Sequence, residues 1–502
     1  MAEFRHGIDR RYMPTRINAV LTAESAHTVN FGLAPMANAV WPAGANRVVY
    51  CLGMEEFQEQ FGWSDDFLTF TLCGAAYSMF VLKGIRGVTF CNVLDAENEA
   101  HTEDVTEETT ARQRFGNPRR TEFGRFGVLA DSVKLYLTDT LGQKIGQPLT
   151  EGEDYTLSTQ NWQLGFSPVM GGAIFAANPG ETEVTLAAEY TCVNPAGVQI
   201  SDVIGGYENG KRSGIECAKD VWPVTKHAPS ILAAPGWSRY AAVYAALGGM
   251  CDMLNRRWDC TFVADIDSGE TGARRWQEVF DAKDKAAQND HRSMTFWPCC
   301  RSGDYILWGS SVLSSLMNEV DARSGSPFES PSNKDMGVSG FCLEDGTEIN
   351  LTDEEANELN PQGITTGIFD RGLYVAWGNY SASGQSTTDP QYMWHNLVRF
   401  VRWKQRSFTL TYRQFLDMPL SGVKVRTILA MENERILGEV NRGISPGGEL
   451  LFNGELNDAT TILNGEAVFS YRWSTWIPMQ SIMVEFEFAY DILVQALKEV
   501  AA

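Results

Sequence analysis

The stretch "SILAAPGWSRYAAVYAALGGMCDML", residues 230–254, decides the fold. A short apolar run meets Pro-Gly and Ser238, and apolar residues then recur at helical spacing. "WDCTFVADID", residues 258–267, is the next apolar run. This order predicts a βαβ unit with parallel strands, in which Ser238 caps the start of the helix. The predicted apolar face of the helix consists of Tyr240, Val243, Tyr244, Leu247, Met250 and Leu254.

A strand, a tight turn and a helix also build phosphate cradles and nucleophile elbows. The turn "AAPGWS" offers one glycine and no lysine, so it matches neither G-x-G-x-x-G nor a P-loop. A G-x-S-x-G match at residues 443–447 follows a helix rather than a strand. It also places Pro446, which has no N–H, where the oxyanion donor is needed. The turn and the match around Ser445 therefore favour a structural role.

Other catalytic or metal-binding patterns are weak. The six histidines match no ligand spacing, and a hydrolase triad of His227 with Asp265 or Asp267 and a serine has no motif to favour it. "DIDSGE" departs from a calcium loop at its third ligand position. We therefore expect no catalytic residue, no metal and no cofactor. The ten cysteines form no C-x-x-C pair and are predicted to be buried free thiols: Cys51, Cys73, Cys91, Cys192, Cys217, Cys251, Cys260, the vicinal Cys299 and Cys300, and Cys342.

Composition limits the partners and the compartment. The formal net charge of −22 argues against nucleic acid, because phosphate binding needs clustered Lys and Arg. No apolar run reaches the roughly 20 residues that span a bilayer, so we expect no direct membrane contact. The first twenty residues are polar and rich in arginine, without the apolar centre of a signal peptide. The sequence thus predicts a protein made in a cytoplasm.

The local patterns of the chain predict a multidomain protein of α/β and α+β class. "RVVYCLGM" and "VTFCNVL" are typical of strands, "EEFQEQFG" of a short helix, and "FLTFTLCGAAYSMFVLKG" of a buried helix. Thr352 and Glu355 form a capping box for a helix that stops at Pro361. After the acidic run "ENEAHTEDVTEETT", short alternating segments predict an inserted all-β domain.

We divide the chain at these changes of character. The predicted units are an N-terminal linker arm (1–20), the first part of a central α/β domain (21–96), an inserted β-rich outer domain (97–200), the main part of the α/β domain (201–380), a C-terminal α+β inner domain that follows the linker "SASGQSTTDP" (381–490), and a C-terminal arm (491–502).

A basic cluster marks the predicted inner domain. Between Trp394 and Leu416 there are five basic residues and no acidic one: Arg399, Arg402, Lys404, Arg406 and Arg413. From Asp389 to the end the chain carries 11 Lys and Arg against 13 Asp and Glu, a net charge of −2, so most of the negative charge lies elsewhere. The cluster is either a solvated face or a surface that docks on an acidic partner.

The order of several segments resembles contractile-tail sheath proteins of phages and related injection machines. "FGLAPMANAV" followed by "EEFQEQFG" and a buried helix is similar to the start of that family. "VIGGYENGKRSGIECAKDVWPVTKHAPSILAAPGWSRYAAVYAAL" with "FVADID" is similar to its central part. "ESPSNKDMGVSGF", "ANELNPQGITTGIFDRGLYVAWGNYSAS" and "VRFVRWKQRSF" resemble its later blocks. The resemblance covers most of the chain except the acidic insertion near residues 97–200.

The resemblance implies a structural protein of a virion tail, assembled in the host cytoplasm. Subunits of that family form hexameric rings stacked helically around a tail tube, between baseplate and tail-terminator proteins. When triggered, the sheath shortens and drives the tube through the target cell envelope. The resemblance also implies a central domain with a subtilisin-like fold, and it places the basic cluster against the tube.

Terminal strands of such a subunit can be exchanged with neighbours. The N-terminal arm lacks core periodicity, and "MVEFEFAY" alternates over eight residues near the C-terminus. Arms that add to a neighbour's sheet keep their backbone hydrogen bonds while rigid bodies rotate. The residues predicted to take part are Arg11, Thr15, Ile17, Val20, Val484, Phe486, Phe488 and Tyr490.

Two other classes of protein remain open from the residues alone. A cytoplasmic α/β hydrolase with a β insertion would run as a small oligomer and turn over esters. A static shell or tube protein would form one lattice only, never a long narrow and a short wide one.

Overall fold

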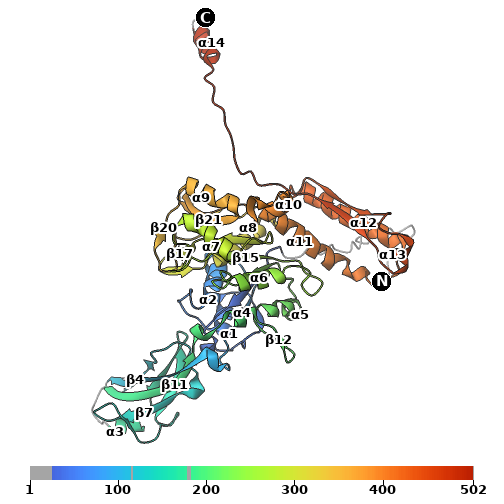
Figure 1. Cartoon of the computed structure of the whole chain (residues 1–502). Coiled ribbons are helices and arrows are strands. Elements are labelled where there is room, and N and C mark those ends of the chain that lie inside the picture. The colour runs from blue at the N-terminus through green and yellow to red at the C-terminus, as the bar shows by residue number, and fades with distance from the viewer. Residues whose placement is uncertain (1–24, 115–116, 178–182, 501–502) are drawn as a thin grey trace, which may run out of the picture.

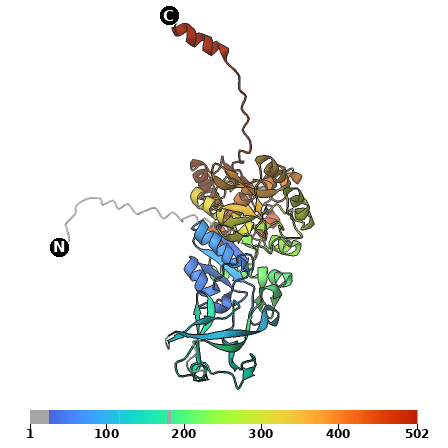
Figure 2. The same cartoon turned by 90° about the vertical axis from the view of Figure 1, so that its left-hand side faces the viewer.

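The computed structural model describes residues 25–114, 117–177 and 183–500. These residues form a mixed α/β multidomain structure with three bodies and a projecting tail (Figure 1). We call residues 25–101 and 194–394 the middle domain, residues 102–193 the β domain, and residues 395–476 the C-terminal unit. The β domain and the C-terminal unit extend from different sides of the middle domain, and the chain then runs away from all three (Figures 1 and 2).

The middle domain is built on an eight-stranded sheet with strand order β2-β3-β1-β14-β15-β16-β21-β22. Its six inner strands run parallel to one another, and the two edge strands β2 and β22 are antiparallel to their neighbours. The strands are β1 (Thr28–Gly32), β2 (Val48–Cys51), β3 (Val88–Asn92), β14 (Ile231–Ala233), β15 (Thr261–Asp265), β16 (Ser293–Phe296), β21 (Ile364–Asp370) and β22 (Leu373–Trp377). Buried parallel strands read as continuous apolar runs, which is why the sequence signals β14 and β15, whereas β1 (TVNFG) and β16 (SMTF) also bury polar residues.

Short and long helices surround this sheet. α8 packs against β14, β15 and β16, and α6 packs against β15. A π-helical turn over Tyr77–Leu82 continues α2, so the predicted buried helix has two parts. The helices of the middle domain are α1 (Met54–Phe61), α2 (Thr71–Ala76), α4 (Ile200–Ile204), α5 (Val221–Thr225), α6 (Ala241–Gly249), α7 (Val279–Lys285), α8 (Gly309–Ser324), α9 (Asp353–Leu359) and α10 (Pro390–Met393).

The opening stretch forms the predicted βαβ unit, with β14 and β15 as parallel neighbours joined through α6. The prediction for Ser238 is wrong: Tyr240 precedes α6, and Ser238 lies in the turn before it. The Ser238 N–H already bonds to Ala234 O at 2.8 Å, and its hydroxyl bonds across to Asp265 instead of to the helix. The helix also ends at Gly249, so Leu254 lies beyond it, although Val243, Tyr244 and Leu247 are buried as predicted.

The capping box at α9 is confirmed. Thr352 Oγ1 accepts from the Glu355 N–H at 3.3 Å, and the Glu355 carboxylate accepts from the Thr352 N–H at 2.9 Å. The predicted linker that begins at Ser381 is a packed loop in its first half, because Ser381 and Ala382 are buried and Lys283 Nζ donates to Ala382 O at 2.7 Å.

The β domain consists of two antiparallel sheets. β4 and β11 pair along their length from Thr102↔Val193 to Arg112↔Glu183. The chain therefore leaves the middle domain and returns to it at adjacent points. Its own core includes Phe123, Phe166 and Leu186. The sheets are β5-β4-β11-β7-β8 and β6-β10-β9. The elements are β4 (Thr102–Arg114), β5 (Asn117–Arg119), β6 (Thr121–Glu122), β7 (Lys134–Thr138), β8 (Lys144–Ile145), β9 (Tyr155–Gln160), β10 (Gln163–Pro168), α3 (Ala173–Ala177) and β11 (Glu183–Val193).

The C-terminal unit is a pair of long helices with a small hairpin. α11 (His395–Tyr412) and α12 (Gly422–Asn441) are followed by β23 (Gly448–Phe452), α13 (Ala459–Leu463) and β24 (Phe469–Trp473). β23 and β24 form a two-stranded antiparallel sheet, and α12 packs against β23. After this unit an extended segment leads to α14 (Tyr490–Val500) (Figure 2).

Two minor sheets complete the middle domain. β17 (Cys299–Ser302), β18 (Tyr305–Leu307), β19 (Gly340–Cys342) and β20 (Glu348–Ile349) form one in the order β18-β17-β19-β20, and β12 (Tyr207–Glu208) and β13 (Lys211–Arg212) form the other.

Candidate assembly interface

The turn of the opening stretch is held by a buried carboxylate at the end of β15. Asp265 is 2 % exposed and accepts hydrogen bonds from the Gly236 N–H (2.9 Å), Ser238 Oγ (3.1 Å), the Ser310 N–H (2.8 Å) and Ser310 Oγ (2.6 Å). Burial raises the pKa of Asp265 although these four donors oppose the shift. The contacts join the turn after β14 to the first turn of α8. This cluster therefore connects elements of the fold.

The other residues considered for catalysis also lie in packed surroundings. The His227 ring stacks on Tyr50, with ring centroids 4.1 Å apart, and on His27 at 5.4 Å. Ser445 Oγ donates to Ser474 O at 2.7 Å. All ten cysteines are buried and free. In the described part of the chain, no group of three or more His, Cys, Asp and Glu side chains could hold a metal ion. None of the helices described is long and apolar enough to cross a membrane.

The basic cluster lies on α11, and it is not a solvated face. Arg399, Arg402, Lys404 and Arg406 are buried, with exposed fractions of 2 to 8 %, and of the five only Arg413, beyond the helix, has an exposed side chain. The expectation of an exposed docking face is thus wrong for these four residues. The physical reason is that each finds an acidic or carbonyl partner inside this chain, and a paired charge can be buried where a free one cannot.

Three of these side chains reach from α11 into the middle domain. Arg399 makes a two-pronged ion pair with Asp321 of α8, at 3.2 and 2.6 Å. Arg402 donates to Cys251 O at 3.0 Å and to Asp252 at 2.7 Å. Arg406 donates to the backbone carbonyls of Asp259 at 2.5 Å and Ser25 at 3.3 Å. Burial lowers the pKa of Arg406 to about 10, so it remains charged at neutral pH.

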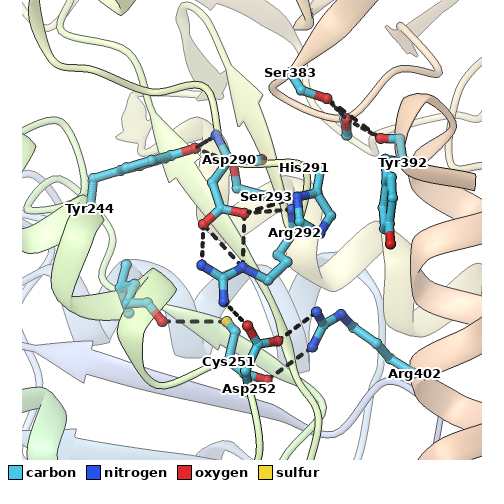
Figure 3. A network of polar contacts seen from close by, with 12 residues as sticks. Tyr244, Cys251, Asp252, Asp290, His291, Arg292, Ser293, Ser383, Tyr392 and Arg402 are labelled. Carbon is cyan, nitrogen blue, oxygen red and sulfur yellow. Dashed lines mark hydrogen bonds and ion pairs between the residues drawn. The ribbon is translucent and has the colours of Figure 1, made fainter. Parts of the chain in front are cut away.

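The contact at Asp252 extends to the segment before β16 (Figure 3). The carboxylate of Asp252 lies between Arg402 and Arg292 and is ion-paired to both. Arg292, directly before β16, is in turn held by Asp290, whose Oδ1 accepts from Arg292 Nε at 2.9 Å. Arg292 lowers the pKa of Asp290, in opposition to burial. A chain of alternating charges therefore connects α11 to the segment that leads into β16.

Lys404 points the other way, into the C-terminal unit. Its Nζ contacts both carboxylate oxygens of Glu439 on α12, at 2.6 and 2.7 Å. Burial and the nearby Arg435 lower the pKa of Lys404 to about 8, against the pull of Glu439. Glu432, which is fully buried, pairs with Arg435 and accepts from the hydroxyls of Tyr412 (2.9 Å) and Tyr471 (2.7 Å). The two helices and β24 are thus held together by charged groups.

Sequence reasoning missed the acidic partners. Asp321 and Asp252 are 78 and 150 positions away from their arginines, and no local pattern marks them. Glu432 and Glu439 did carry a signal, because they fall on the same helical face as Ile436, which is also buried. Two glutamates on an apolar helix face indicate buried cations nearby.

The chain after the C-terminal unit is extended and apolar. Val484, Phe486 and Phe488 are between 61 and 94 % exposed. Residues 477–489 belong to no strand within this chain, and Tyr490 is the first residue of α14 rather than the last of a strand. The predicted N-terminal arm, with Arg11, Thr15, Ile17 and Val20, lies outside the described residues.

No protein-family model matches the chain. It is 23% identical over 511 residues to the tail sheath protein of Burkholderia phage BcepMu, an alignment that covers 98% of each chain. It is 24% identical over 292 residues to a putative prophage major tail sheath protein of Pseudomonas aeruginosa, covering 56% of this chain and 71% of that one. The resemblance to tail sheath proteins is thereby confirmed.

The fold agrees with this relationship. A sheath complex of an extracellular contractile injection system, PVC, in the contracted state, superposes with a TM-score of 0.55 at 10% identity, covering 98% of this chain and 99% of that one. At this identity the match shows a shared fold. The homologues of this chain are therefore tail sheath proteins, which are structural proteins.

Proposed function

We propose that this protein is the sheath subunit of a contractile phage tail or a related injection machine. The observation that carries the proposal is the match of the whole chain, at 98% of both lengths, with a phage tail sheath protein. The shared fold with a contractile injection system sheath supports it. In this role the subunits form hexameric rings around a tail tube, between baseplate and terminator proteins. The rings assemble in the host cytoplasm, and contraction drives the tube through the target envelope.

Electron microscopy of the purified chain tests this function. We expect helical tubes of stacked rings in two forms, one long and narrow and one short and wide. A small oligomer with esterase activity would support the hydrolase alternative. A single lattice under all conditions would support a static shell or tube.

Exchanged strands are proposed as the connections between subunits. Residues 477–489 present apolar side chains, while β23 and β24 form a sheet of only two strands. This small sheet is supported on one side by α12, and a third strand would add backbone hydrogen bonds at its edge. Each added hydrogen bond contributes about 1 kcal/mol, so a few strands hold neighbours together while the bodies rotate.

Two truncated chains test the role of each arm separately. A chain that ends at Ser481 and a chain that lacks residues 1–20 should both fold as monomers and fail to form tubes. Replacement of Glu485 by Gln is the control, since it keeps the apolar face and the backbone. Long tubes from either truncated chain would contradict the role of that arm.

Two further parts of the proposal concern the outer and inner surfaces. The β domain, with its own core and adjacent entry and exit, would be the outer domain and dispensable for tube formation. Replacing residues 103–192 with a short glycine linker should leave a chain that still forms tubes, with a smaller outer diameter.

Of the basic cluster, we still propose contact with the tail tube only for Arg413, because its side chain is exposed. Arg413→Glu should weaken co-assembly with the tube and leave sheath polymers intact.

A further inference from the structure

Helix α11 contacts the root of each terminal arm. Near its start, Asn396 Nδ2 donates to Trp476 O at 3.1 Å, directly before the extended segment 477–489. Near its end, Arg406 donates to Ser25 O, shortly after the predicted N-terminal arm. The two contacts are ten positions apart, or about 15 Å along a helix with 1.5 Å rise per residue. One rigid element therefore holds both roots.

The same helix is fixed to the middle domain at three separate points. Arg399, Arg402 and Arg406 follow at intervals of three and four residues, so they project from one face of α11. Their partners come from three different places: the last turn of α8, the residues after α6, and Asp259, two residues before β15. Contacts at three points along a helix oppose both sliding and rotation of that helix.

The burial of these contacts makes them hard to open. Both side chains of the Arg399–Asp321 pair are 2 % or less exposed. A bend between the C-terminal unit and the middle domain would separate this pair and leave two charges without a partner in a dry environment. The Asp252 contact is different, because the Asp252 side chain is 57 % exposed and can be hydrated when Arg402 leaves.

We infer that Arg399, Arg402 and Arg406 are positioning residues that clamp α11, and with it the root of the C-terminal arm, to the middle domain, beside the root of the N-terminal arm. The inference rests on the proposed function, in which neighbouring subunits pull on the arms. A pull on the C-terminal arm then moves the middle domain, to which the N-terminal arm is joined directly, without bending the chain between the two bodies. The basic cluster thus acts inside the subunit, as the coupling between the interlocked arms and the body that rotates.

The clamp can be tested by the distance between the two bodies. Because all ten native cysteines are buried, introduced surface cysteines can be labelled selectively. Spin labels are attached to the full chain at Phe280→Cys on α7 and Leu437→Cys on α12, both exposed positions. Pulsed electron paramagnetic resonance then measures the distance between the two labels. The clamp variant is Arg399→Met with Asp321→Leu, which removes both partners and leaves no unpaired charge.

The matched control is Lys404→Met with Glu439→Leu. It also removes a buried ion pair of α11, but one that lies within the C-terminal unit. We expect one narrow distance distribution for the unaltered clamp and for the control, and a broad or double distribution for the clamp variant. Equal, narrow distributions in all three would overturn the inference.

Two outcomes need separate readouts. If the clamp variant does not fold, Arg402→Gln replaces it, since its partner Asp252 is hydrated; this variant should also broaden the distribution, and an unchanged one overturns the inference. Tube formation is scored separately by electron microscopy. A broadened distribution in a chain that never forms tubes would support the clamp and contradict the proposed function.

Discussion

The middle domain and the C-terminal unit differ in how far paired charges contribute to their interiors. The middle domain packs apolar side chains around its sheet, among them Phe31, Phe90 and Phe262, in one large cluster. The apolar cluster of the C-terminal unit is much smaller, with Phe400, Trp403 and Ile444 as its buried members. Beside further buried apolar side chains such as Val398 and Leu450, this unit also buries paired charges such as Lys404 and Glu439. Apolar packing tolerates small changes, whereas a buried ion pair fails when either partner is lost.

The largest effect is expected from a single charge in the C-terminal unit. Glu432→Gln keeps the size of the side chain but leaves Arg435 buried without its counter-ion. Such a loss costs about 3–5 kcal/mol, measured as the free energy of unfolding in guanidinium chloride. Glu434→Gln, two residues away and exposed, is the control and should stay within about 0.5 kcal/mol. Equal costs for the two variants would show that the buried network does not stabilise this unit.

Acid should destabilise both regions through one histidine each. Burial, helped by His227 and Arg406, lowers the pKa of His27 from 6.5 to about 3, and burial beside Arg399 lowers that of His395 well below 6.5. Below pH 6.5 the unfolded chain binds protons that the folded chain does not, so stability falls as the pH falls. For His27 we expect a loss of about 2 kcal/mol between pH 7 and pH 5, and for His395 a loss in the same direction.

Two substitutions test which histidine causes this loss of stability at low pH. His27→Asn should remove the part that belongs to the middle domain, and His395→Asn the part at the start of α11. Thermal unfolding followed at several pH values measures both. A pH profile that neither substitution flattens would assign the acid sensitivity to other groups.

The smallest change in free energy is expected in the apolar core. Ile231→Val in β14 removes one buried methylene and should cost about 1 kcal/mol. The comparison with Glu432→Gln is direct, because both substitutions change very few atoms. If Ile231→Val cost as much as the loss of the charge, the contrast between the two interiors would be wrong.

The two interiors also predict that, in the unaltered protein, the C-terminal unit unfolds before the middle domain. The ten cysteines all lie before residue 343, so thiol reactivity reports on the middle and β domains only. In moderate denaturant we expect helix content, measured by circular dichroism, to fall before the thiols react. Simultaneous loss of helix and appearance of thiols would instead show that the two regions unfold as one cooperative unit.

Local sequence patterns determined much of this protein. The continuous apolar runs of β14 and β15, the spacing of Val243, Tyr244 and Leu247, and the capping box at Thr352 all follow from neighbours in the chain. The ordered blocks that resemble tail sheath proteins were likewise readable, and the relatives of the chain confirm them. Signals of this kind survive because the groups that interact are a few residues apart.

Only the tertiary structure decided what the charged and polar groups do. Ser238 had the right place for a helix cap, but the turn used its N–H and placed its hydroxyl against Asp265, 27 positions away. The arginines of α11 are a basic face in sequence and an internal clamp in the fold, because Asp321 and Asp252 come from distant segments. Whether a charge is solvated or buried depends on partners that the fold brings near, and local sequence does not contain them.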